Sequence, residues 1–176
     1  TALPQDTRTR IVDAALALFN GDGAHAVSTR HVAAKLGISP GNLYYHFANK
    51  EEIVLALYER IETELLGILA PPPAPVPSFD AVLAYLDRLF AHLWDYRFFY
   101  RDLTGLLQDV PGLKERYRLL AGRAQENAQQ IFHRMIEQDW MEATDEQVEL
   151  LAANAWIVLS QWFTYWQVMS RRKSIQ

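Results

Sequence analysis

Apolar residues recur at helical spacing along most of the chain, and the first clear case lies near the N-terminus. Five residues there follow the spacing i, i+3, i+4, i+7 and i+8, which places them on one face of a helix. They are Ile11, Ala14, Ala15, Leu18 and Phe19. Asp6 or Thr7 can cap the start of this helix. Gly21 and Gly23 are expected to end it.

Two short helices are predicted within residues 28–47. Ser28 is a suitable N-cap for the first, and Gly37 tolerates the left-handed backbone found just past a helix end. Ser39 followed by Pro40 predicts the start of the second. Serine can cap a helix, and proline at the first helical position loses no hydrogen bond that the helix needs.

A long fourth helix is predicted to follow Asn49, which can cap it and forms a capping-box-like pair with Glu52. Its apolar face comprises Ile53, Leu57, Ile61, Leu65 and Ile68. Five of the eight prolines then fall within 71–77, a density that no helix survives. This segment is therefore predicted to be a stiff, extended connector.

The rest of the chain also reads as helix. Helical stretches are predicted at about 78–94, in shorter pieces at 98–108, and at about 113–138 and 145–170. The residues 98–100 are the only place that suggests a strand, and they are too few to form one of consequence. The chain is therefore predicted to be all-α.

Composition excludes several classes of protein. Half of the residues are apolar and the net charge is only −4, which is unlike a disordered chain. There is no cysteine, so neither a disulfide nor a thiolate metal site is possible. We find no apolar run of about 18 residues, the length that spans a bilayer, and no signal-peptide pattern. We therefore expect a cytoplasmic protein without a membrane segment.

Charge is unevenly distributed. Residues 1–50 hold 5 Lys and Arg against 3 Asp, or +2, and the remaining residues hold 12 against 18, or −6. A mildly basic head on an acidic body suits a protein whose N-terminal part meets nucleic acid.

Residues 28–47 are predicted to act as one helix-turn-helix unit. Ala33 is small where two helices would cross, Gly37 lies at the turn and Leu43 anchors the second helix. Such packing leaves the second helix free to enter a major groove. Its outward positions carry no carboxylate, and they are Gly41, Asn42, Tyr44, Tyr45 and His46.

Four sequence runs carry a family resemblance: Thr29-Arg30, Ala-Ala-Lys-Leu-Gly-Ile-Ser at 33–39, Leu-Tyr-Tyr-His-Phe at 43–47, and Asn49-Lys50. Over about residues 9–57 the chain resembles the DNA-binding head of the TetR family of bacterial one-component regulators. The resemblance implies a three-helix DNA-binding domain at 1–48 and a helical ligand-binding and dimerisation domain at 49–176. The helix 49–69 would link the two.

The resemblance also implies roles for individual residues. Thr29, Tyr44 and Lys50 would contact phosphates, whereas Arg30, Asn42, Tyr45 and His46 would face the groove. The complete predicted DNA-binding set is Ser28, Thr29, Arg30, Ser39, Gly41, Asn42, Tyr44, Tyr45, His46 and Lys50.

Structural roles remain open for some of these residues. Tyr44 and Tyr45 could pack in a core, but Leu43 and Phe47 already fill the inward face, so at least one tyrosine must point outward. His46 could equally be structural, and Arg30 could be a solvated charge.

Eleven of the 21 aromatic residues gather in two groups, at 90–100 and 156–166. Packing in a core or an interface is the favoured interpretation for any one of them. The alternative is that these residues form the wall of a pocket for an aromatic or apolar effector. The pocket would lie between the linking helix, the 78–94 helix and the two last helices. The candidate pocket residues are His92, Tyr96, Phe99, Arg101, Asn154, Gln161, Trp162 and Trp166.

The two last helices are apolar on more than one face, so each must be buried on several sides. Isologous pairing of two chains into a four-helix bundle would bury them. The candidate interface residues are Ile131, Met135, Leu151, Ala155, Leu159 and Phe163.

Nothing in the sequence favours an enzyme. There is no His-Glu-x-x-His, glycine-rich phosphate loop or Gly-x-Ser-x-Gly, and His92 and His133 lack metal-ligand spacing. We therefore expect no catalytic site, cofactor or metal. The predicted function is a ligand-responsive repressor that binds a palindromic operator as a homodimer and is released by a small apolar or aromatic effector. The alternative is a helical scaffold or interaction protein that has lost DNA binding.

Overall fold

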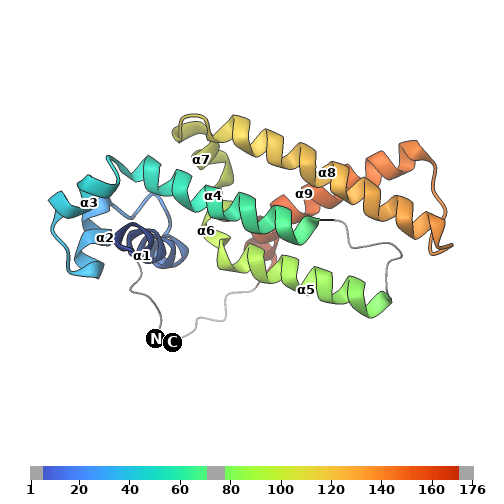
Figure 1. Ribbon diagram of the computed structural model, residues 1–176, viewed down its shortest axis with the longest axis horizontal. Coiled ribbons are helices and arrows are strands. Elements are labelled where there is room, and N and C mark those ends of the chain that lie inside the picture. Colours follow the sequence, from blue (N-terminus) through green and yellow to red (C-terminus); the bar gives the residue numbers. More distant parts are fainter. Residues whose placement is uncertain (1–5, 71–77, 171–176) are drawn as a thin grey trace. The chain divides into compact units, whose positions relative to one another are not determined.

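The computed structural model describes residues 6–70 and 78–170, and within these ranges all regular structure is helical. The all-α prediction is confirmed. The helices run in the order α1 (Thr7–Asp22), α2 (Thr29–Leu36), α3 (Pro40–His46), α4 (Lys50–Leu69), α5 (Phe79–Asp95), α6 (Arg97–Arg101), α7 (Leu103–Asp109), α8 (Leu113–Glu137) and α9 (Asp145–Met169) (Figure 1). The predicted proline-rich connector at 71–77 lies outside the described residues.

The chain divides into two compact units. The first comprises residues up to Thr63 together with Asp95–Lys114, and the second comprises Glu64–Trp94 and the chain from Glu115 onward. Helix α4 contributes to both units, because the division falls within it. The domain boundary predicted at residue 48 separates a DNA-binding part from a ligand-binding part, and it stays a prediction.

The helix ends in the first unit follow from local hydrogen bonds. Ser28 Oγ accepts the amide of His31 at 3.3 Å, and His31 Nδ1 accepts the amide of Ser28 at 3.3 Å, which completes a reciprocal cap. Gly37 ends α2 in the left-handed region at φ +65°, as predicted. Ser39 Oγ accepts the Asn42 amide at 3.1 Å and starts α3.

The start of α4 also agrees with the sequence pattern. Asn49 Oδ1 accepts the amide of Glu52 at 2.9 Å. The Glu52 carboxylate accepts the amide of Ala48 at 2.7 Å, so the return bond reaches one residue before Asn49. These two hydrogen bonds fix the turn between α3 and α4.

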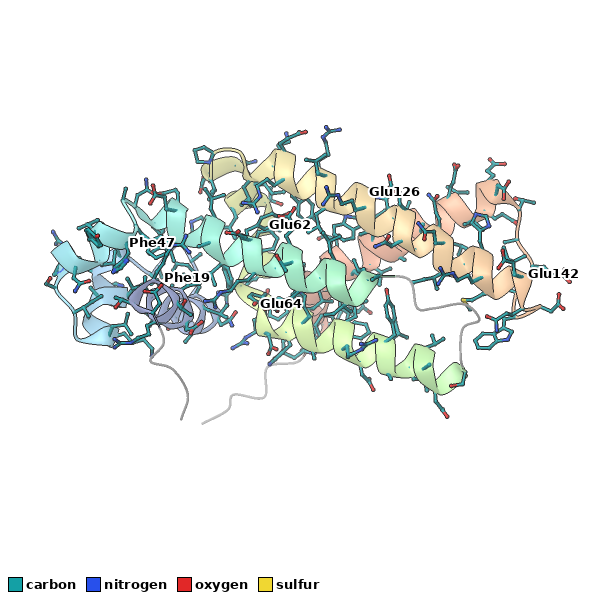
Figure 2. The ribbon with its side chains drawn as sticks, viewed as in Figure 1. Phe19, Phe47, Glu62, Glu64, Glu126 and Glu142 are labelled. Atoms are coloured by element: carbon teal, nitrogen blue, oxygen red, sulfur yellow. The ribbon has the colours of Figure 1, made fainter. Side chains whose placement is uncertain are left out.

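Large aromatic side chains fill the core of the first unit. Phe19 and Phe47 are buried among helices α1 to α4 (Figure 2). Phe98 and Phe99 of α6 are also fully buried, with Phe98 at 5.4 Å from Phe19 and Phe99 at 5.3 Å from Tyr58, measured between ring centroids. The segment that suggested a strand is therefore a buried helical turn, because its aromatic rings pack against α1 and α4.

Hydrogen bonds also hold α6 to α1. The Asn20 amide nitrogen donates to the carbonyl of Asp95 at 2.7 Å, and the Asn20 amide oxygen accepts from the Phe98 N–H at 3.0 Å. Arg101 donates to the carbonyl of Phe19 at 2.9 Å. Gly23 ends α1 at φ +91°, where a Cβ would lie only 3.2 Å from the Arg101 guanidinium. We call Asn20 and Arg101 the α1–α6 clamp.

The second unit is built from the end of α4 with α5, α8 and α9. Leu89, Leu93 and Ala152 are among its buried residues. Helices α8 and α9 are joined by a turn in which Asp139 has φ +57°. Thr144 then caps α9 by a reciprocal pair with Gln147, which explains why α9 begins at Asp145.

Candidate nucleic-acid interface and ligand cavity

Helix α3 presents its aromatic residues outward on a buried anchor. Leu43 and Phe47 are 1% and 2% exposed, whereas Tyr44 and Tyr45 are 48% and 86% exposed. A tyrosine left in water on a short helix contributes little to folding, so the two rings are available to a partner. His46 is half-buried, and its ring is nearly perpendicular to that of Tyr45, with the two ring centroids 5.2 Å apart.

Two of the three predicted phosphate-contacting residues, Thr29 at the start of α2 and Tyr44 on α3, lie in contact. The hydroxyls of Thr29 and Tyr44 lie 3.3 Å apart, so a single hydrogen bond orients both. The Lys50 ammonium donates to the carbonyl of Ala24 at 2.9 Å. An ammonium has three donors, so this contact fixes the position of Lys50 and leaves capacity for an anion.

The remaining predicted DNA-binding residues are exposed on the same two helices or at their starts. Arg30, Ser39, Gly41 and Asn42 are all accessible, and Ser28 is accessible while its hydroxyl caps α2. No Asp or Glu occurs between Thr29 and Asn49, so no carboxylate of this segment opposes a phosphate.

Arg8 is a basic residue beside this surface that the sequence pattern did not single out. Its guanidinium lies over the Phe47 ring, 4.8 Å from the centroid, at the end of α3. Only the fold reveals this proximity, because the two residues are far apart in the sequence.

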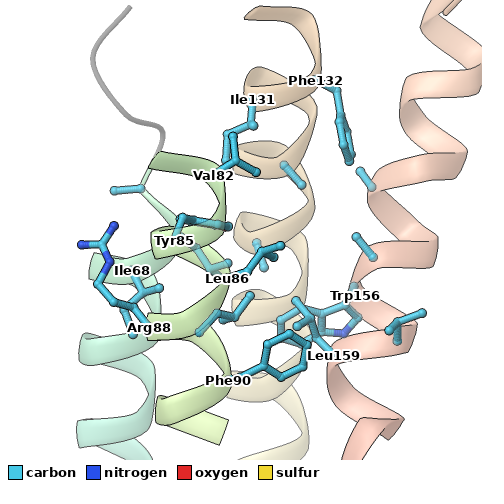
Figure 3. A pocket seen from close by; sticks show the side chains of 18 of the residues that line it. Ile68, Val82, Tyr85, Leu86, Arg88, Phe90, Ile131, Phe132, Trp156 and Leu159 are labelled. Atoms are coloured by element: carbon cyan, nitrogen blue, oxygen red, sulfur yellow. The ribbon is translucent and has the colours of Figure 1, made fainter. Parts of the chain in front are cut away.

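A cavity of about 700 Å³ lies in the second unit. Its wall is formed by Gly67–Ala70 at the end of α4, by α5, α8 and α9, and is almost entirely apolar (Figure 3). Phe90 and Trp156 lie at one end of the view and Ile131 and Phe132 at the other. Its size falls within the range of about 300–1,000 Å³ that accommodates drug-sized ligands.

The eight residues predicted to line an effector pocket lie elsewhere, and none of them lines this cavity. Tyr96 and Phe99 belong to the buried core of the first unit, and Arg101 is part of the α1–α6 clamp. Asn154 and Gln161 are exposed on α9. Their separation from the cavity could not be seen in the sequence because the helix faces are set by packing.

The other three predicted pocket residues pack within the second unit. His92 is buried, with Nδ1 at 3.4 Å from a Glu64 carboxylate oxygen. Trp162 packs against Phe90 at 5.3 Å and lies parallel to Trp166 at 6.4 Å between ring centroids. The aromatic group around Trp162 is therefore a packed cluster beside the cavity wall at Phe90.

The residues predicted for a dimer interface divide into three environments. Leu151 is exposed and Phe163 is buried, and the other four line the cavity, namely Ile131, Met135, Ala155 and Leu159. Besides Leu151, the large apolar residues that α9 leaves exposed are Leu150, Ile157, Val158, Tyr165, Trp166, Val168 and Met169.

Two family models match adjoining parts of the chain. Residues 11–57 match the family described as bacterial regulatory proteins, tetR family, and residues 60–176 match a TetR model described as bacterial transcriptional repressor. The chain belongs to the TetR family. It is therefore a TetR-family transcriptional regulator with a helix-turn-helix DNA-binding head, and the resemblance drawn from the sequence is confirmed.

Curated relatives match mainly in the TetR head. UidR, an HTH-type transcriptional regulator of Escherichia coli K12, is 43% identical over 68 residues, which are 39% of this chain and 35% of UidR. SrpR of Pseudomonas putida is 38% identical over 84 residues, 47% of this chain and 39% of SrpR. The matches thus span less than half the length of these relatives.

Solved structures of TetR-family regulators match over nearly the whole chain. A regulator from Marinobacter aquaeolei VT8 has a TM-score of 0.87 at 33% identity, over 94% of this chain and 82% of that one. PfmR of Thermus thermophilus has a TM-score of 0.69 at 23% identity, over 95% and 88%, which shows a shared fold.

Among the described residues, none of the helices combines the length and hydropathy needed to cross a bilayer. Within the same ranges, no cluster of three or more His, Asp or Glu side chains is arranged to hold a metal ion.

Proposed function

We propose that this chain represses transcription as a homodimer on a palindromic operator and is released by a small effector bound in the cavity of the second unit. The observation that carries the proposal is the exposed α3 surface on a buried anchor, in a chain whose second unit holds an apolar cavity. The description of the matching family as a repressor supports the direction of regulation.

On DNA, we assign positioning to Thr29, Tyr44 and Lys50 and base reading to Asn42 and Tyr45. The hydroxyl pair of Thr29 and Tyr44 would approach one phosphate. Gly41 offers no side chain, so base reading would depend on the neighbouring residues, among them Tyr45, whose side chain is 86% exposed.

Pairing of two chains follows from the exposed apolar residues of α9. One face of α9 carries four of these exposed residues, because their separations are close to whole turns of a helix. They are Leu150, Ile157, Tyr165 and Val168. A soluble monomer rarely exposes so many large apolar side chains on one element, and a two-fold interface would cover them.

Regulation would pass along α4. This single helix begins at Lys50, directly after the recognition helix, and its last turn forms part of the cavity wall. A ligand that favours the unbound conformer by about 3 kcal/mol would reduce DNA affinity about a hundredfold.

Selection of binding sites from random genomic fragments in the presence of competitor DNA tests the proposal. We expect an inverted repeat whose half-sites lie about 34–36 Å apart, or a multiple of that distance. Tyr45→Ala should weaken binding, and Trp140→Ala, which removes an exposed aromatic side chain from the turn before α9, should not. Absence of any selected sequence would instead favour the scaffold alternative.

The oligomeric state is tested separately by sedimentation. Ile157→Glu should convert the dimer to a monomer, because a charge would be buried in the pairing surface. Leu83→Glu places the same charge on an exposed position of α5 and should not. A wild-type chain that sediments only as a 20.2 kDa species at micromolar concentration contradicts the dimer.

A further inference from the structure

The chemistry of the cavity wall restricts what the cavity can hold. Of the residues that line it, all are apolar or glycine except Tyr85, Arg88 and the indole of Trp156. The wall contains no carboxylate. A cationic ligand would find no counter-charge there, and a ligand with many polar groups would leave most of them without a hydrogen-bond partner.

The Trp156 indole presents its ring to the cavity. Tyr117 lies beside it, with ring centroids 5.6 Å apart, and the Tyr117 hydroxyl makes hydrogen-bonding contacts with the side chains of Trp156 and Ser160. The indole N–H therefore has a protein partner. The polar groups left to a ligand are those of Tyr85 and Arg88.

Tyr85 and Arg88 lie three residues apart on α5 and so occupy the same side of the helix. In Figure 3 the Tyr85 ring extends from α5, and the Arg88 guanidinium lies beside Ile68 at the α4 edge of the cavity. Arg88 is exposed, and it forms no ion pair with any residue in the described ranges. A guanidinium at the rim of an apolar chamber is a ready donor to an anion.

The protonation state of Tyr85 supports the same role. Burial raises the pKa of the Tyr85 hydroxyl, and the positive charge of Arg88 lowers it by a smaller amount. The phenol therefore remains protonated at neutral pH and can donate a hydrogen bond.

We infer that the cavity takes a large apolar molecule with a single anionic group, its body enclosed by α5, α8 and α9 and its anion held at the rim by Tyr85 and Arg88. The inference rests on the proposed function, because this molecule would be the effector. It specifies the chemical class of the effector as an amphipathic carboxylate or sulfonate.

Two fluorescent probes that differ only in the charged group test this class. Anilinonaphthalene sulfonate and N-phenylnaphthylamine share an aromatic body, and each brightens in an apolar site. We expect the wild-type protein, without DNA, to bind the sulfonate about tenfold more tightly, as one partly exposed charge-assisted contact provides. Dodecanoate should displace either probe at lower concentration than dodecanol does.

Matched variants locate the contact. Arg88→Gln should remove the preference for the sulfonate and leave the affinity for N-phenylnaphthylamine within twofold. Tyr85→Phe should reduce the preference by less. Arg123→Gln removes an exposed charge from α8 outside the cavity wall and should change neither affinity. Ala128→Leu, which fills the cavity from α8, should weaken both probes if they bind there.

Each contrary result overturns the inference. Equal affinity for the two probes, or an unchanged preference for the sulfonate in Arg88→Gln, would contradict the proposed binding of an anionic group. If a folded Ala128→Leu variant still binds both probes as tightly, the probes bind outside the cavity. The proposed function fails in a separate measurement. If dodecanoate binds in the cavity with the expected preference but the selected operator is not released, the ligand class stands and the regulatory role falls.

Discussion

The two units of the chain differ in how completely they are filled. In the first unit, the rings of Phe19, Phe47 and Phe98 are buried in the core. The α1–α6 clamp makes hydrogen bonds with the carbonyls of Phe19 and Asp95 and with the amide of Phe98. In the second unit the helices leave about 700 Å³ unoccupied. A DNA-binding surface needs side chains held in fixed positions, whereas the effector site that we propose for the second unit needs space for a ligand. Close packing cannot meet both requirements.

The largest expected effect is the loss of a ring from the filled unit. Phe19→Ala should lower the free energy of unfolding by about 3–5 kcal/mol, because it opens a hole in a packed core. Phe90→Ala removes a ring that already borders the cavity and should cost clearly less. Urea unfolding monitored by circular dichroism measures the free energy of unfolding of both variants. Equal decreases in the two variants would contradict the difference in packing between the units.

The clamp comes next. Asn20→Ala should cost about 1–3 kcal/mol, because the carbonyl of Asp95 and the amide of Phe98 lose their partner together. Asn20→Asp keeps an acceptor for Phe98 and should cost less than Asn20→Ala. Hydrogen exchange at the Phe98 amide distinguishes the Asn20→Ala and Asn20→Asp variants. If the amide stays protected in Asn20→Ala, the aromatic contacts of Phe98 and Phe99 are sufficient to hold α6 in place.

Enlarging an alanine should have opposite signs in the two units. Ala15 is fully buried in α1, so Ala15→Leu should destabilise by about 1–3 kcal/mol through overpacking. Ala155 borders the cavity, so Ala155→Leu should stabilise by about 0.5–2 kcal/mol. Thermal unfolding midpoints report both signs, and destabilisation by Ala155→Leu would mean that the cavity collapses in solution.

Replacing Tyr45 should separate binding from folding. Because this side chain is 86% exposed, Tyr45→Ala should change the free energy of unfolding by no more than about 0.5 kcal/mol. Affinity for the selected operator should nevertheless fall, as fluorescence anisotropy would measure. A loss of stability equal to the loss of binding would assign Tyr45 a structural role.

The smallest effect concerns an exposed ion pair on α8. The side-chain hydrogen bond from Arg118, aided by its charge, lowers the pKa of Glu115. Because the folded-state pKa is the lower one, this stabilisation is present at neutral pH and is lost as pH falls through the Glu115 pKa. Arg118→Gln should raise that pKa in an NMR titration and leave stability nearly unchanged, since both groups are fully solvated.

The helix boundaries and the inward faces of the head could be predicted because their causes are local. Ser28, Gly37 and Ser39 act through hydrogen bonds and backbone angles that reach three or four residues, so the pattern alone predicts where α2 and α3 begin or end. Leu43 and Phe47, at i and i+4, occupy the inward face for the same reason, so the sequence requires at least one outward tyrosine, and the structure exposes both Tyr44 and Tyr45.

The cavity and the second unit's exposed surface were decided by tertiary structure. Helices α8 and α9 are apolar on several faces, so their sequences do not say which face meets α5, which lines a hole and which remains exposed. Ile131 and Leu159 therefore line the cavity and were predicted for a dimer interface, while Ile157 and Val168 are the exposed residues. Likewise, only packing brings Phe98 of α6 against Phe19 of α1. Helix periodicity specifies that a face is apolar, but a void is defined by the volume that four helices together fail to fill, and no single stretch of sequence carries that information.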